Sequence, residues 1–176
     1  MTDEPLAGWS EATPTIGSRG LERARTATEA EKAEIVAALS LVSLSRLEVT
    51  YRIRRLGDER YQLSGRLRAG LEQACVVTCE PVAAELDEPF DVEYRAGSSE
   101  HRPSALDDEI EVLSAPEIEP LMGGTIDVGR IVFETLAAAL PAYPRRPDAK
   151  LETDESRPAA PAPGPFAALS DWPREG

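Results

Sequence analysis

Two stretches in which apolar and polar residues strictly alternate, separated by a short turn, constrain the fold of this chain most. In the first stretch, every second position is apolar, at Leu47, Val49, Tyr51 and Ile53. The second repeats the pattern at Tyr61, Leu63, Gly65, Leu67, Ala69 and Leu71 and continues through Gln73, Cys75 and Val77. Because successive side chains of a β-strand point to opposite faces, each stretch predicts a half-buried strand. Residues 55–59 supply the turn, and the pair therefore predicts a long antiparallel hairpin.

A third alternation follows the hairpin and predicts a further strand. Its inward face carries Leu86, Phe90, Val92 and Tyr94. Pro89 falls on its outward face and predicts an edge position, because proline donates no ladder hydrogen bond. In the hairpin itself, Gly65 falls on the inward face and predicts either a bulge or a close backbone approach.

Two helices are predicted, one on each side of these strands in the sequence. Thr28 and Glu31 have the spacing of a capping box, which predicts a helix from about Glu29 to Leu39. Asp127 is a candidate N-cap for a second helix over about residues 128–140. The apolar stripe of this second helix consists of Ile131, Val132, Leu136 and Leu140.

The order of these elements predicts an α+β fold, in which an antiparallel meander or hairpin sheet is backed by two helices. We expect one domain over residues 20–147. Residues 1–19 are interrupted by Pro, Gly and Ser and predict a flexible arm or an edge strand. Residues 148–176 are acidic and rich in Pro and Ala, which predicts a disordered tail. An apolar motif in this tail is a candidate partner-docking element, with Phe166, Leu169 and Trp172.

The charge of the chain is strongly polarised along the sequence. The net charge of −13 argues against nucleic-acid binding over the whole surface. However, residues 46–68 hold seven Arg and three acids, whereas residues 80–119 hold 13 acids and two Arg. Four arginines fall on the outward faces of the hairpin, and guanidinium groups suit phosphate oxygens: Arg52, Arg54, Arg66 and Arg68. Two interpretations stay open, a solvated face paired with nearby acids and a local contact with an RNA backbone.

Cys75 and Cys79 are the two cysteines of the chain, four positions apart. A structural zinc site uses four ligands, and His101 is the one further strong ligand that the sequence offers. On a strand the two thiols would lie about 13 Å apart. That is too far to share a metal or to form a disulfide, although a turn at residues 79–81 would shorten the gap. We expect two small residues at a strand end, no metal and no cofactor, and a nearly neutral effect of Cys79→Val.

The sequence offers no motif of catalysis or membrane insertion. It has no phosphate-cradling glycine loop, no nucleophile elbow and no metalloprotease helix. Neither a secretory signal nor a run of about 18–20 apolar residues is visible. We therefore expect a cytoplasmic protein that is not an enzyme, takes no small-molecule substrate and does not contact a membrane.

Several short motifs occur in the order and at the distances found in one bacterial family. They are Ser64–Leu67, Gln73–Thr78, Glu80–Val82, Glu88–Phe90, Thr125–Gly129 and Ala142–Pro147. Together they resemble the large ribosomal RNA subunit accumulation protein (YceD-like) family in its alphaproteobacterial form, over about residues 20–150. The resemblance implies a non-enzymatic role in ribosome biogenesis. This role would support the accumulation or processing of large-subunit (23S) rRNA, through binding of that rRNA or of a ribosomal protein.

The cysteine motif departs from this family pattern. Many family members carry Cys-x-x-Cys here, which hints at a metal, whereas this chain has Thr78 at the second cysteine position. Cys79 stands where an apolar residue is usual. A second interpretation of the whole chain also stays open: an acidic protein-interaction adaptor without direct RNA contact, whose acidic segment binds a basic ribosomal protein.

Overall fold

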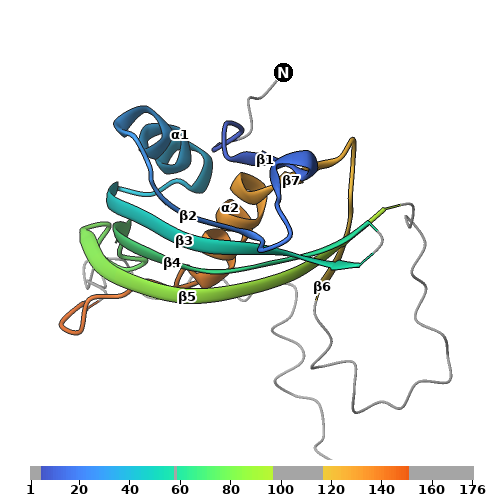
Figure 1. Ribbon diagram of the computed structural model, residues 1–176. Helices are drawn as coiled ribbons and strands as arrows, with labels where there is room; N and C mark the ends of the chain where they lie inside the picture. The colour runs from blue at the N-terminus through green and yellow to red at the C-terminus, as the bar shows by residue number, and fades with distance from the viewer. Residues whose placement is uncertain (1–4, 58, 97–116, 151–176) are drawn as a thin grey trace, which may run out of the picture.

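A five-stranded sheet with two helices on one face makes up most of the computed structural model, which describes residues 5–57, 59–96 and 117–150 (Figure 1). The order across the sheet is β2 (Leu21–Thr26), β3 (Ser43–Gly57), β4 (Arg60–Ala74), β5 (Pro81–Arg95) and β6 (Glu117–Pro120). Neighbouring strands are antiparallel, except that β6 lies parallel to β5. The helices are α1 (Glu29–Leu39) and α2 (Val128–Ala139). The predicted α+β fold, a mostly antiparallel sheet with two helices, is confirmed.

The long hairpin of β3 and β4 has the predicted inward face. Its alternating apolar side chains are buried, among them Leu47, Val49, Tyr51, Ile53, Leu63 and Leu67. β5 pairs with β4 over 15 residues and adds Phe90, Val92 and Tyr94 to the same core. The inner face of the sheet is therefore a continuous apolar surface against which α1 and α2 pack.

Gly65 marks a close approach within the sheet. A Cβ atom at this position would overlap the Phe90 ring and lie 2.6 Å from the backbone oxygen of Thr50. The register runs unbroken from Tyr51 through Gly65 to Phe90, so no bulge is present here. Of the two predicted alternatives, the structure shows the close approach.

Pro89 lies on a part of β5 that forms an edge of the sheet. β6 pairs with β5 only over Val92–Arg95. In the parts of the chain that the structure describes, no strand pairs with residues 81–91 on that side. The predicted edge position is thus right for Pro89, whereas the last residues of β5 lie inside the sheet.

Both helices begin at the predicted caps. The Thr28 hydroxyl accepts a hydrogen bond from the Glu31 N–H, and the Glu31 carboxylate accepts one from the Thr28 N–H. At the start of α2, the Asp127 carboxylate accepts from the Arg130 N–H at 3.0 Å. Such caps satisfy backbone donors that a helix cannot satisfy itself.

The N-terminal residues pack into the fold, and of the two alternatives predicted for residues 1–19 the structure shows the edge strand. Leu6 and Trp9 are only 1% and 3% exposed. β1 (Ser10–Ala12) pairs with β7 (Thr125–Asp127), as an edge strand would, and a short 3-10 helix, Thr13–Thr15, follows it. The domain therefore extends N-terminally of residue 20. The apolar residues of this segment that join the core, Leu6, Trp9 and Ile16, are spaced without a regular period in the sequence.

Three features considered in the sequence lie outside the described residues. They are the candidate metal ligand His101, the candidate docking motif with Phe166, Leu169 and Trp172, and the tail from residue 151 onward.

We predict that Gly65→Ala destabilises the protein by about 1–3 kcal/mol, because the added methyl group must displace the Phe90 ring and crowd the Thr50 carbonyl. Denaturant unfolding measures the change. Gly17→Ala is the matched control, since a Cβ there meets no atom within 4 Å. Equal midpoints for the two variants would contradict the close approach.

Candidate functional site

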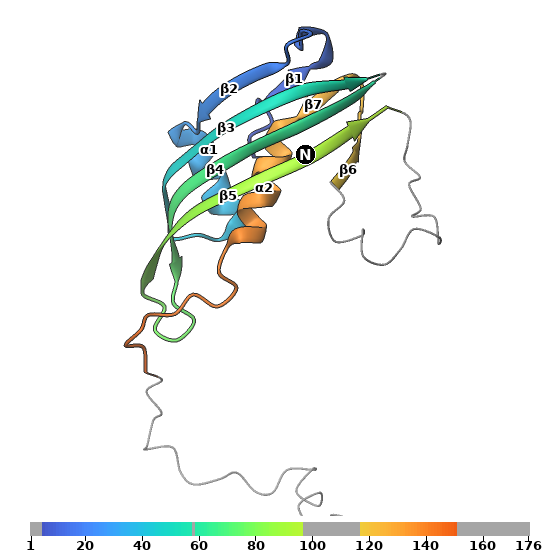
Figure 2. The ribbon, with the colours of Figure 1, turned by 60° about the horizontal axis from the view of Figure 1, so that its bottom comes forward.

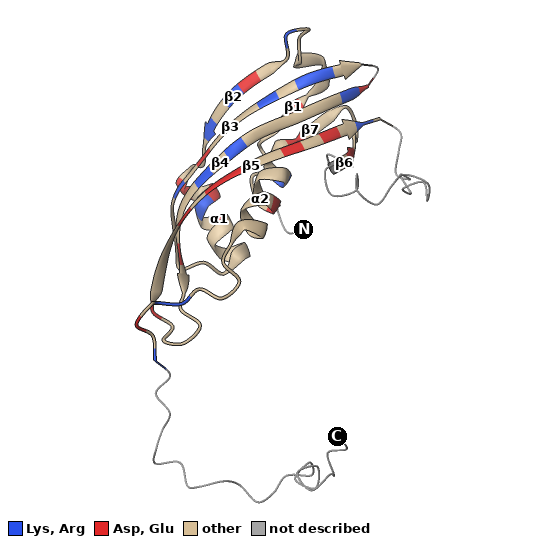
Figure 3. Ribbon diagram, turned by 90° about the horizontal axis from the view of Figure 1, so that it is seen from below, with Lys and Arg blue, Asp and Glu red and all other residues tan. Residues whose placement is uncertain are grey.

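Charged residues are spread over the strands β2 to β5 (Figure 3), and the register places many of them on the outer face of the sheet, opposite the helices. The strand register arranges them in rows that cross the sheet. One row is Glu22, Arg52, Ser64 and Asp91; the next is Ala24, Thr50, Arg66 and Pro89; the third is Thr26, Glu48, Arg68 and Asp87. Opposite charges are therefore neighbours across the strands, as in Glu48, Arg68 and Asp87, whereas β4 carries two successive arginines.

The four predicted arginines lie on this face, in a staggered arrangement. Arg52 is opposite Ser64, and Arg66 is opposite Thr50, so Arg52 and Arg66 are diagonal neighbours. Such neighbours are about 7–8 Å apart. Arg54 and Arg68 are opposite Gln62 and Glu48, respectively. The stagger avoids the repulsion of two like charges placed directly opposite each other.

Three of these arginines form ion pairs with acids on adjacent strands. Arg66 Nη1 lies 3.3 Å from Asp87 Oδ1, and Arg68 Nε lies 3.5 Å from Asp87 Oδ2. Arg52 Nε lies 3.1 Å from Glu22 Oε1, but its N–H makes no hydrogen bond and the nitrogen is buried. The arginines are thus neither free nor fully neutralised, because one carboxylate serves both Arg66 and Arg68.

Small residues leave the centre of this face hollow. An open trough of about 870 Å³ is lined by Ala24, Thr50, Ser64 and Gly65 together with Arg52, Arg66, Glu22, Pro89 and Asp91, among others. A smaller hollow of about 230 Å³ lies between Arg66 and Arg68. Guanidinium groups beside open hollows can reach an incoming phosphate.

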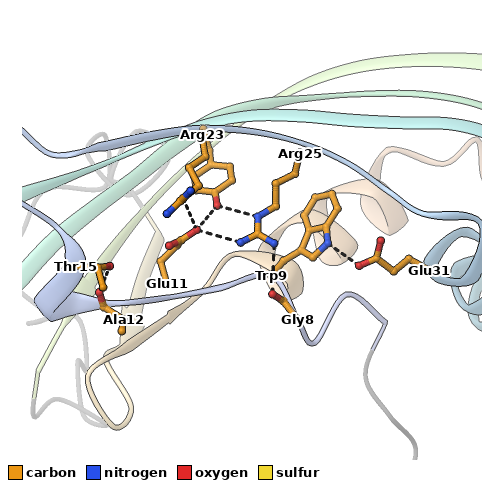
Figure 4. A network of polar contacts seen from close by, with 9 residues as sticks. Gly8, Trp9, Glu11, Ala12, Thr15, Arg23, Arg25 and Glu31 are labelled. Atoms are coloured by element: carbon orange, nitrogen blue, oxygen red, sulfur yellow. Dashed lines mark hydrogen bonds and ion pairs between the residues drawn. The ribbon is translucent and has the colours of Figure 1, made fainter.

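A buried polar network lies on the opposite face of the sheet (Figure 4). Glu11 Oε1 accepts a hydrogen bond from the Tyr51 hydroxyl at 2.6 Å and from Arg25 Nη2 at 3.3 Å, and it lies 3.1 Å from Arg23 Nε. Burial and the hydrogen bond to Glu11 raise the pKa of Tyr51. This network joins β1 to β2 and β3, and we infer that it stabilises the fold and takes no part in binding.

Sequence reasoning missed this network because Glu11 stands in a segment without periodicity. Trp9 extends the network, donating its indole N–H to Glu31 at 2.7 Å. The Arg25 guanidinium lies over the Trp9 ring, 5.7 Å from its centroid. The capping glutamate of α1 is therefore also a contact of the N-terminal segment.

The two cysteines lie in a tight turn, and the predicted strand geometry for them is wrong. β4 ends at Ala74, and the Cys79 N–H donates to the Cys75 carbonyl at 2.9 Å. Cys75 is buried and Cys79 is exposed. Cys79 has a φ of 60°, a conformation that a β-branched side chain rarely adopts. Cys79→Val should consequently strain the turn, contrary to the neutral effect expected from the sequence.

The Cys75 thiol is enclosed by hydrogen-bond donors. Those from the Thr78 hydroxyl and the Arg146 N–H, together with the N–H groups of Thr78 and Val77, lower its pKa to about 6, against the opposing effect of burial. The segment that follows α2 closes the turn, since the Val76 N–H donates to the Pro144 carbonyl at 2.9 Å. Within the described residues, no group of three His, Cys, Asp or Glu could hold a metal ion.

Comparison with known proteins places this chain in a family. The family model described as "Large ribosomal RNA subunit accumulation protein YceD" matches residues 63–170, more than half of the chain. The chain belongs to the YceD family. Neither curated proteins nor solved structures give a match. The segment matched to YceD includes Arg66 and Arg68, whereas Arg52 and Arg54 precede it. None of the described helices is long and apolar enough to cross a membrane.

In this YceD family member, Thr78 stands three positions after Cys75. Its hydroxyl makes the largest contribution to the lowered pKa of the Cys75 thiol. The turn therefore holds a single buried sulfur by hydrogen bonds, and the exposed Cys79 lies outside this arrangement.

We predict that Cys75 titrates near pH 6 and that Thr78→Val moves this titration towards the ordinary value of 9.0. The ultraviolet absorbance of the thiolate, measured in a Cys79→Ser background, gives both values. Because the folded pKa is lowered, the thiolate contributes stability above pH 9 that is lost as the pH falls through about 6. Titration near pH 9 in both proteins would contradict the proposed hydrogen bonding.

Proposed function

We propose that this YceD family member is a non-enzymatic, cytoplasmic ribosome-biogenesis factor that supports accumulation of large-subunit rRNA by binding that rRNA. Membership of the YceD family supports the role in the accumulation of large-subunit rRNA. The contact is inferred from one observation, namely that Arg66 and Arg68 flank hollows on the outer face and share only Asp87 as an acidic partner among the described residues. Both arginines also lie in the matched segment.

The strengths of the outer-face ion pairs are compatible with phosphate binding. The Arg66 and Arg68 side chains are 49% and 58% exposed, and surface ion pairs contribute only about 0.2–1 kcal/mol each. An RNA phosphate can therefore replace Asp87 at small cost, and it gains charge-assisted hydrogen bonds from a planar guanidinium. Release of counterions from the RNA adds to the affinity.

The outer face provides contacts to the backbone rather than to the bases. None of the described residues lining its trough on the outward side is aromatic, so base stacking is not supplied there. We therefore propose binding that follows the shape and charge of rRNA, with sequence specificity supplied elsewhere in the assembly.

A second candidate function is that of an acidic adaptor that binds a basic ribosomal protein. It is favoured by the exposed outward residues of β5, of which Glu85, Asp87 and Asp91 are acidic. Capture of partners from lysate before and after nuclease treatment separates the two functions. Partners that persist after RNA is removed support the adaptor, whereas rRNA-dependent partners support the RNA contact.

We predict that Arg66→Ser combined with Arg68→Ser weakens binding to large-subunit rRNA. The slope of log affinity against log salt should also become shallower, by roughly 0.7–0.9 for each phosphate that the variant no longer binds. Filter binding over a salt series measures both. The matched control combines Arg19→Ser with Arg145→Ser, which removes the same charge at positions away from the outer face. Equal binding by the two double variants would contradict the assignment of the site.

A further inference from the structure

The free part of the β5 edge lies beside helix α2 and is accessible for strand pairing. β6 covers β5 only at Val92–Arg95. Among the described residues, no strand covers the edge over residues 81–91. Figure 2 shows β5 at the margin of the sheet next to α2. An uncovered edge strand presents unpaired backbone groups to any segment that can pair with it.

The backbone groups directed to this edge can be identified from one hydrogen bond. The Leu121 N–H donates to the Arg95 carbonyl at 2.8 Å, so the backbone N–H and carbonyl of Arg95 point towards β6. These groups point to alternate sides from one residue of a strand to the next, so those of the other odd-numbered residues of β5 also point towards this edge. Ala83, Glu85, Asp87 and Asp91 therefore present both an N–H and a carbonyl, whereas Pro89 presents a carbonyl only.

A groove of about 510 Å³ adjoins the edge, between β5 and α2. Apolar side chains line much of it, including Phe90, Val92, Ile131, Ala138 and Ala139. Three acidic residues also line it, Glu88, Asp91 and Glu134, although the Asp91 carboxylate points to the outer face, and no Lys or Arg is among the described lining residues. The groove therefore combines an apolar floor with negative charge.

Two of these carboxylates lack a cationic partner among the described residues. Glu134 pairs with Arg130 at 3.0 Å. Asp91 accepts hydrogen bonds from the Gln62 amide at 3.0 Å, and neither Asp91 nor Glu88 forms an ion pair with any residue that the structure describes. The Glu88 side chain is partly buried. Negative charge in a half-enclosed groove is stabilised by a cation that approaches from outside.

We propose that this edge and groove bind an extended, basic peptide segment of a partner protein, which adds to the sheet as a strand alongside residues 83–91. The backbone pairing supplies affinity, and side chains at alternate positions of the peptide face the groove. On the groove side, the side chains of the peptide contact the apolar floor and Glu88, and on the outer side its lysine or arginine side chains approach Asp91. This proposal concerns a different surface from the rRNA contact and stands independently of it.

The same residues disfavour other occupants of the edge. Pro89 removes one edge N–H, and Glu88 places a charge towards α2, both of which are features that protect edge strands from indiscriminate pairing. A second copy of this chain would bring identical carboxylates against each other across a symmetric interface. A basic segment neutralises that charge, so the edge selects for cationic partners.

The test uses fluorescence anisotropy with the full chain and a labelled ten-residue peptide of alternating Lys and Val. Two control peptides separate the contributions: one has Glu in place of Lys, and the other carries N-methyl groups at alternate backbone nitrogens. We expect saturable binding of the Lys–Val peptide and at least ten-fold weaker binding of both controls. Equal binding of the N-methylated peptide would show charge attraction without strand pairing and would overturn the proposal.

Protein variants test the two halves of the site. Asp91→Pro removes an edge N–H without removing a bond to β4, and Asp91→Ser is its control because it removes the carboxylate but keeps that N–H. Asp91→Pro should bind the peptide at least ten-fold more weakly than Asp91→Ser. Glu88→Gln should weaken binding several-fold, whereas Glu48→Gln, on the outer face, should not.

Circular dichroism checks that each variant folds. If Asp91→Pro does not fold, the test relies on peptide binding by Glu88→Gln. Unchanged binding by the folded variants overturns the proposal. A dimer, detected by light scattering, that Asp91→Pro dissociates would assign the edge to a second copy and also overturn it. Loss of rRNA binding by the Arg66 and Arg68 variants with peptide binding retained would confirm two separate sites.

Discussion

The buried carboxylate of Glu11 is the interaction on which the closed inner face of the sheet depends. Tyr51, Arg25 and Arg23 all contact its Oε1 atom, and these contacts tie β1 to the sheet. Removing these partners would leave the Glu11 carboxylate, whose side chain is only 6% exposed, with a buried charge that is not compensated. With the inner face filled by the N-terminal residues and two helices, the outer face and the free edge of β5 are the surfaces of the described sheet that remain for partners.

These two surfaces differ in charge and in the contacts that they offer. The outer face mixes arginines with acids and presents side chains, so it suits a phosphate backbone. The β5 edge presents backbone groups beside an acidic groove, so it suits a basic strand. Asp87 contributes to both, since its side chain contacts Arg66 and Arg68 while its backbone faces the edge. The strand β5 therefore lies between the proposed rRNA surface and the proposed peptide-binding edge.

Local signals in the sequence predicted much of this fold, and contacts between distant residues account for the rest. The capping box of Thr28 and Glu31 and the alternation of the hairpin depend on neighbouring residues and were predicted correctly. The alternation continues to Val77 in the sequence, but the strand ends at Ala74, because the segment after α2 holds residues 75–80 in a turn. The arginine face was predicted, whereas its pairing with Asp87 depends on the register of β5 and has no local signal.

Ultraviolet crosslinking in cells, with sequencing of the attached RNA and mapping of the crosslinked peptides, tests the rRNA contact most directly. If the outer face binds RNA, we expect crosslinks to large-subunit rRNA and its precursors, located in peptides that include Arg66 and Arg68. Crosslinks to proteins alone, or rRNA crosslinks confined to other parts of the chain, would contradict it.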